Sequence, residues 1–187
     1  MSKLQEIIEY NKEFVNNKDY EKYVTTKIPK KKMVILSCMD TRLTELLPKA
    51  MNIKNGDAKI IKDAGATVMH LFGGIMRSIL VAVYEFGVED IFVVGHYGCG
   101  MSNLDTTDIV NKMMNRGIKK ETLVTLNNGG IDVERWLHGF ESVEVSIKES
   151  VSMIKSHPLL PQNIKVHGLI MNPETGEIEV VLNGDKY

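Results

Sequence analysis

Two short segments carry side chains that can hold a metal ion. The segment Cys38–Arg42 reads C-M-D-T-R, and the segment His96–Gly100 reads H-Y-G-C-G. They contain the only two cysteines of the chain. Two thiolates and one imidazole make a zinc site with three protein ligands and an open fourth position, which is the arrangement of a catalytic zinc. The sequence therefore predicts one zinc per chain, with Cys38, His96 and Cys99 as its ligands.

A carboxylate and a guanidinium follow the first cysteine closely. Asp40 can accept a hydrogen bond from a water molecule on the metal, or it can take the fourth metal position itself and close the site. The planar fork of Arg42 can hold the Asp40 carboxylate with two hydrogen bonds and so pull it off the metal. We expect alkaline conditions to favour the open form, since hydroxide then outcompetes the carboxylate.

Other interpretations of these residues explain less. Buried thiols and a core histidine would account for each residue alone, but not for all of them together at strand ends. A structural zinc needs four protein ligands, which holds only if Asp40 fills the fourth place. A cysteine phosphatase needs a longer loop between its cysteine and its arginine than the one from Cys38 to Arg42. The glycine order of residues 95–100 departs from that of a dinucleotide-binding loop.

Strands must position these side chains. The apolar runs 33–37 and 89–95 each end where one of the two segments begins, and such short runs are typical of buried strands in a parallel sheet. Ligands gather at the carboxyl ends of such strands. If the two strands are neighbours, the thiols and the imidazole meet at one edge of the sheet.

The rest of the chain alternates between helical and strand patterns. Helices are predicted over 3–16, 71–86, 103–116 and 141–155, strands over 57–61, 164–171 and 177–183, a loop at 127–130 and a turn at 172–176. This order predicts an α/β fold with a mostly parallel central sheet flanked by helices and a C-terminal antiparallel edge strand.

Composition indicates an ordinary globular protein. The 187 residues are 43% hydrophobic and 25% charged, with a net charge of -1, and we expect one domain spanning residues 1–187. The charge gives no reason to bind nucleic acid, and no run approaches the roughly 18 apolar residues of a membrane span. The N-terminus lacks the pattern of a secretory signal, so we expect reduced thiols and a cytoplasmic location.

The two metal-binding segments resemble the zinc motifs of the β-class carbonic anhydrases. The resemblance runs over most of residues 30–183. It includes the glycine turn at 63–66, the helix around 76–79, the segment 156–161 and the last two strands. It implies the family's fold and a zinc-bound hydroxide that attacks carbon dioxide to give bicarbonate and a proton.

The resemblance also implies roles for further residues. Asp40 and Arg42 match the family's gate pair, and Gly65 matches a glycine turn that lets the backbone approach the substrate cleft. His70 is a candidate proton relay. The helical arm of residues 1–24 is expected to pack on a partner subunit in a homodimer or larger homo-oligomer.

Two departures and two alternatives accompany the resemblance. Ile35 stands where members with a second, regulatory bicarbonate pocket have tryptophan, so that pocket is not expected. Tyr97 stands where the family often has a small polar residue. Relatives with the same zinc frame hydrolyse carbon disulfide or carbonyl sulfide, and a non-enzymatic zinc-bearing or carbon-dioxide-sensing protein is the other alternative.

Overall fold

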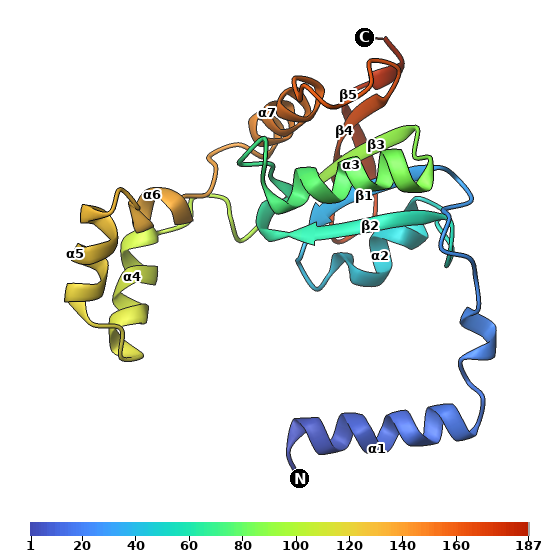
Figure 1. Cartoon of the computed structure of the whole chain (residues 1–187), viewed down its shortest axis with the longest axis horizontal. Coiled ribbons are helices and arrows are strands. Elements are labelled where there is room, and N and C mark those ends of the chain that lie inside the picture. The colour runs from blue at the N-terminus through green and yellow to red at the C-terminus, as the bar shows by residue number, and fades with distance from the viewer. Residues whose placement is uncertain (187) are drawn as a thin grey trace.

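A five-stranded sheet forms the centre of the molecule in the computed structural model, which describes residues 1–186 (Figure 1). The strands are β1 (Met33–Cys38), β2 (Ala58–Asp63), β3 (Asp90–His96), β4 (Lys165–Met171) and β5 (Ile178–Leu182). Their order is β2-β1-β3-β4-β5; the first three pairings are parallel and β4 pairs with β5 antiparallel. The prediction of a mostly parallel sheet with an antiparallel C-terminal edge is confirmed.

Helices cover both faces of the sheet. The helices of the chain are α1 (Lys3–Asn16), α2 (Leu43–Ala50), α3 (Gly74–Phe86), α4 (Thr106–Asn115), α5 (Lys120–Asn128), α6 (Val133–Leu137) and α7 (Val143–Lys155). Side chains of α3 and α7 pack in one apolar cluster with Val34, Leu36 and Val93 of the sheet. Side chains of α2 pack in a second cluster with the alternate residues Ile35 and Val94. Burial on both faces explains why these strands are apolar throughout rather than alternating.

Two glycines let α7 approach the sheet closely. A Cβ atom on Gly95 would lie 2.7 Å from a methyl of Val143, and one on Gly168 would lie 2.6 Å from a methyl of Ile147. Both contacts are shorter than any that real side chains make, so glycine is required at these positions of β3 and β4. The close packing places α7 beside the strand end that carries His96.

The helices differ from the prediction in where α3 begins and in three helices that were not predicted. Helix α3 begins at Gly74 rather than at Leu71, and Phe72 ahead of it is 78% exposed. Helix α2 was not predicted because it is short and contains Pro48. Helices α5 and α6 were not predicted either, because at 9 and 5 residues they are too short to show a clear apolar periodicity. Asn127 and Asn128, predicted as loop, form the last turn of α5.

Two parts of the chain stand apart from the sheet. Helices α4, α5 and α6 form a separate helical lobe (residues 104–139), and α1 lies at the end of an extended N-terminal arm (Figure 1). No residue of α1 or of the lobe helices is buried. Within residues 1–186, no helix combines the length and the apolarity needed to cross a membrane.

Candidate metal centre

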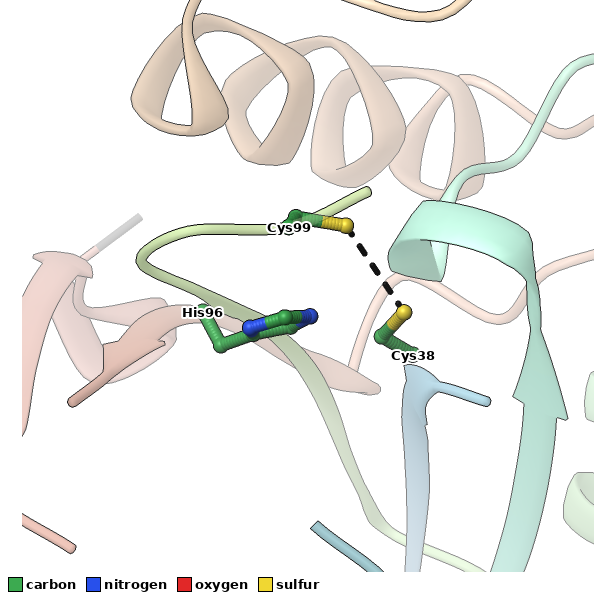
Figure 2. Close-up of side chains that lie close together, drawn as sticks. All are labelled: Cys38, His96 and Cys99. Atoms are coloured by element: carbon green, nitrogen blue, oxygen red, sulfur yellow. Dashed lines mark hydrogen bonds between the residues drawn. The ribbon is translucent and has the colours of Figure 1, made fainter. Parts of the chain in front are cut away.

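Neighbouring parallel strands bring the two cysteines and His96 together. Cys38 is the last residue of β1, His96 is the last residue of β3, and Cys99 lies in the turn that follows β3. One ligand atom from each residue lies within 4.8 Å of the others, and all three side chains are buried. Figure 2 shows the His96 ring pointing toward the space between the two sulfur atoms.

The separation of the sulfur atoms fits a tetrahedral metal site. The Sγ atoms of Cys38 and Cys99 are 3.7 Å apart, and both cysteines are free. Zinc–sulfur bonds of about 2.3 Å at the tetrahedral angle place two sulfurs about 3.8 Å apart. A disulfide would bring them to about 2.05 Å. The two thiols therefore stand at the spacing of zinc ligands.

One nitrogen of the His96 ring is hydrogen-bonded, and the other has no hydrogen-bond partner among the described residues. Its Nδ1 atom donates to the carbonyl oxygen of Tyr97 at 2.9 Å, which leaves the lone pair on Nε2. Nε2 is buried and has no hydrogen-bond partner among the described residues. A buried nitrogen without a partner costs free energy unless it coordinates something. This orphaned atom, facing two thiols, fits a zinc ligand.

The surroundings of Cys38 favour its thiolate. The pKa of Cys38 is lowered, chiefly by the hydrogen bond from the Cys99 thiol and, against the effect of burial, by the backbone N–H of Gly65. The same contact with Cys38 raises the pKa of the Cys99 thiol. The Gly65 N–H lies 3.4 Å from Cys38 Sγ.

Both the backbone conformation at position 65 and the lack of room for a side chain there favour glycine. Gly65 has a φ of +85°, and a Cβ atom there would lie 2.9 Å from the Phe140 ring and 3.3 Å from Met101. The residue follows β2 in a short 3-10 turn (Ala64–Ala66). The absence of a side chain thus lets its N–H reach the Cys38 sulfur.

Asp40 and Arg42 form a bidentate ion pair beside the centre. Arg42 Nη2 donates to Asp40 Oδ2 at 2.8 Å and Arg42 Nε donates to Asp40 Oδ1 at 3.0 Å. The backbone N–H of Arg42 also donates to Oδ1, at 2.9 Å. The side-chain hydrogen bonds from Arg42 are the main reason that the pKa of Asp40 is lowered to about 2.

The ion pair sets where the carboxylate lies. Asp40 Oδ2 is 3.7 Å from His96 Nε2, so it stands next to the point that the ligand atoms face. Arg42 Nη2 donates in addition to the carbonyl oxygen of Gly98 at 3.0 Å. Arg42 therefore holds the carboxylate while it is itself held by the loop between His96 and Cys99.

A cavity of about 1580 Å³ opens onto these residues. Its wall is mostly apolar and comes from both the sheet side and the helical lobe, including Met39, Met69, Leu104, Trp136 and Phe140. An apolar wall suits a small uncharged ligand better than an ion.

The lining includes one carboxyl group that the sequence analysis did not single out. Asp63, the last residue of β2, lines the cavity, and burial is the main cause that raises its pKa to about 6. Its position at a strand end, like those of Cys38 and His96, is the signal that would have identified it. His70, the candidate proton relay, is exposed and is not among the residues that line the cavity.

Comparison with known proteins agrees with this geometry. Residues 33–178 match the carbonic anhydrase family model. YvdA of Bacillus subtilis, provisionally named a carbonic anhydrase, is 56% identical over 184 residues, which cover 98% of this chain and 93% of YvdA.

A solved structure and a more distant relative extend the comparison. The β-carbonic anhydrase isoform I of Trichomonas vaginalis superposes with a TM-score of 0.89 at 35% identity, covering 98% of this chain and 100% of that one. A carbon disulfide hydrolase of Acidithiobacillus thiooxidans is 27% identical over 158 residues, covering 79% of this chain and 76% of that protein. The chain belongs to the β-carbonic anhydrase family.

Proposed function

We propose that the protein reversibly hydrates carbon dioxide to bicarbonate and a proton, with zinc held by Cys38, His96 and Cys99. The observation that supports this most is the bidentate pair of Asp40 and Arg42, which keeps the carboxylate off the fourth metal position. Bound zinc supplies a Lewis acid that lowers the pKa of water at its open position toward neutrality.

The side chains around that position have distinct tasks. Asp40 accepts a hydrogen bond from the attacking water and so aims its lone pair at the carbon atom of the substrate. Its carboxylate is ionised at neutral pH, as an ordinary aspartate would be, and Arg42 lowers the pKa further, to about 2. The apolar cavity wall admits an uncharged substrate. Gly65 is not among the residues that line the cavity, and its N–H supports the Cys38 thiolate instead.

Stopped-flow hydration of carbon dioxide, with the zinc content measured in the same preparation, tests the proposal. We expect about one zinc per chain, turnover at about pH 7 and faster turnover at about pH 8.5, since hydroxide then competes better for the metal. Stoichiometric zinc without turnover at either pH would favour a structural or sensing protein instead.

Hydrolysis of carbon disulfide or carbonyl sulfide is the second candidate. It is favoured by the relative named a carbon disulfide hydrolase and by the apolar cavity wall. Release of hydrogen sulfide from carbon disulfide, without hydration of carbon dioxide, would select it.

We propose further that the functional unit is a homodimer or larger homo-oligomer in the cytoplasm, where thiols stay reduced. The arm of residues 1–24 is the part we expect to contact a partner. Leu4 and Ile7 of α1 are exposed with no cover from their own chain. Burial of such side chains against a second subunit would remove apolar surface from water.

A further inference from the structure

The loop between His96 and Cys99 is tethered to the far edge of the sheet by one side chain. Tyr97 Oη donates to Glu179 Oε2 at 2.7 Å, and Glu179 lies on the edge strand β5. Gly98 and Gly100 have no side chains to anchor the loop. The backbone N–H of Tyr97 donates to the Met171 carbonyl, which continues the pairing of β3 with β4.

Two contacts of the metal centre depend on carbonyl groups of this loop. The carbonyl oxygen of Tyr97 accepts from His96 Nδ1 at 2.9 Å, and that of Gly98 accepts from Arg42 Nη2 at 3.0 Å. The second bond uses the same nitrogen that donates to Asp40 Oδ2 at 2.8 Å. The position of the Gly98 carbonyl thus helps to decide where the Arg42 fork lies.

Apart from its hydrogen bonds to Asp40 and to the Gly98 carbonyl, little holds the Arg42 guanidinium in place. Its side chain is 45% exposed, and its side-chain hydrogen bonds are those to Asp40 and to the Gly98 carbonyl. Gly98 has a φ of +62° and open space around its Cα, so its own packing does little to hold the carbonyl. If the carbonyl shifted, Arg42 would lose one of its two anchors and Asp40 would be released toward the metal.

We propose that Tyr97, through Glu179, is a positioning residue for the Asp40–Arg42 gate. Its side chain holds the loop so that the Gly98 carbonyl meets Arg42, and Arg42 in turn keeps Asp40 off the fourth metal position. The antiparallel edge strand β5 thereby takes part in keeping the site open. The catalytic consequence rests on the proposed function, whereas the effect on metal coordination does not.

Cobalt(II)-substituted protein gives a readout that does not depend on turnover. The visible absorption bands of cobalt bound to two thiolates and an imidazole change when a carboxylate replaces water as the fourth ligand. We expect Tyr97→Phe to shift the spectrum at neutral pH toward the carboxylate-bound form. We also expect it to lower hydration of carbon dioxide by the zinc enzyme about two- to fivefold, as for one lost hydrogen bond.

Tyr84→Phe is the matched control. Tyr84 is also an exposed tyrosine, and its hydroxyl donates to the Leu159 carbonyl at 2.8 Å, away from the metal centre. Thermal unfolding of the two variants should be similar, while only Tyr97→Phe should change the spectrum. Equal spectra for the parent and for both variants would overturn the proposal.

Two further variants test the route of the effect. Glu179→Gln keeps an acceptor and should resemble the parent, whereas Glu179→Ala should resemble Tyr97→Phe. In an Asp40→Asn background, Tyr97→Phe should leave the spectrum unchanged because no carboxylate remains to close the site. If Tyr97→Phe still shifted the spectrum in the Asp40→Asn background, the effect would not act through the Asp40 carboxylate, and the proposal would be overturned. A spectral shift in a protein that never hydrates carbon dioxide would instead support the positioning role and contradict the proposed function.

Discussion

The metal centre and the helical lobe are built in opposite ways. At the centre, the ligand side chains are buried and are oriented by backbone groups of their own chain: Gly65 for Cys38 and Tyr97 for His96. In the lobe, no helix buries a side chain, and Trp136 is 60% exposed. One chain thus brings all three candidate metal ligands together, while its lobe and its N-terminal arm leave apolar side chains exposed.

The largest effect is expected at the centre itself. Cys38→Ser should lower zinc affinity by more than the roughly 10- to 100-fold that is typical of losing a group beside a ligand, because it removes a ligand. Metal analysis after dialysis measures this, and thermal stability should fall with the metal. Met39→Leu, at an exposed neighbouring position, is the control. Full zinc content in Cys38→Ser would refute the assignment.

The gate should affect turnover without affecting the metal. Arg42→Ala removes both side-chain donors that hold Asp40 and leaves only the backbone N–H, so the carboxylate can turn to the fourth position, and hydration of carbon dioxide should fall on the order of 10²-fold. Zinc content should stay near one per chain. Arg77→Ala, which removes an exposed arginine of α3, is the control. Parent-like activity of Arg42→Ala would leave Arg42 as a surface ion-pair partner only.

The arm should affect assembly without affecting the metal. Ile7→Asp places a charge on the exposed apolar face of α1, and burial of one such side chain contributes about 1.5–3 kcal/mol. The dissociation constant of the dimer, measured by sedimentation velocity, should therefore rise about tenfold or more, with zinc content unchanged. Asn11→Asp is the control, because it changes the charge of α1 by the same amount without removing an apolar side chain. A parent protein that sediments as a monomer at micromolar concentration would contradict the expectation.

Gly65→Ala should show how tightly the centre is packed. The substitution combines a left-handed backbone with a Cβ atom 2.9 Å from the Phe140 ring, and strain of this kind costs about 1–3 kcal/mol. Gly87→Ala is matched in backbone, with a φ of +64°, but has open space around it. Gly65→Ala should lower the thermal stability more than Gly87→Ala does. Equal losses of thermal stability in the two variants would mean that the Phe140 ring moves away from the added Cβ atom at no cost.

The smallest effect concerns Asp63 and pH. Burial raises its pKa from 3.8 to about 6, so its charged form is disfavoured in the folded protein. Its stabilising contribution is complete below pH 3.8 and is lost as the pH rises through about 6. Asp63→Asn should therefore gain stability relative to the parent as the pH rises from about 4 to about 7, as measured by paired thermal melts. A difference that does not change with pH would exclude this ionisation.

The strand ends were predictable, and of the lobe only α4 was. The strands leading to Cys38 and His96 are buried on both faces, so their apolar runs are visible in the sequence, and the sheet class followed from them. Helices α5 and α6 are only 9 and 5 residues long, so no clear periodic pattern marks them. Helix α3 starts late because Gly73 is its N-cap and Gly74 its first residue, although Leu71 and Phe72 extend the apolar pattern backward.

The sequence by itself determined the donor set at the metal centre and the class of fold. A chain with two cysteines, each at the end of an apolar run, has few other ways to bring thiols and an imidazole together. The tertiary structure decided that Arg42 holds the Asp40 carboxylate beside His96, that Asp63 rather than His70 lines the cavity, and that Tyr97 reaches Glu179. These contacts join residues through strand order and loop conformation, and neither of these can be read from local residue patterns.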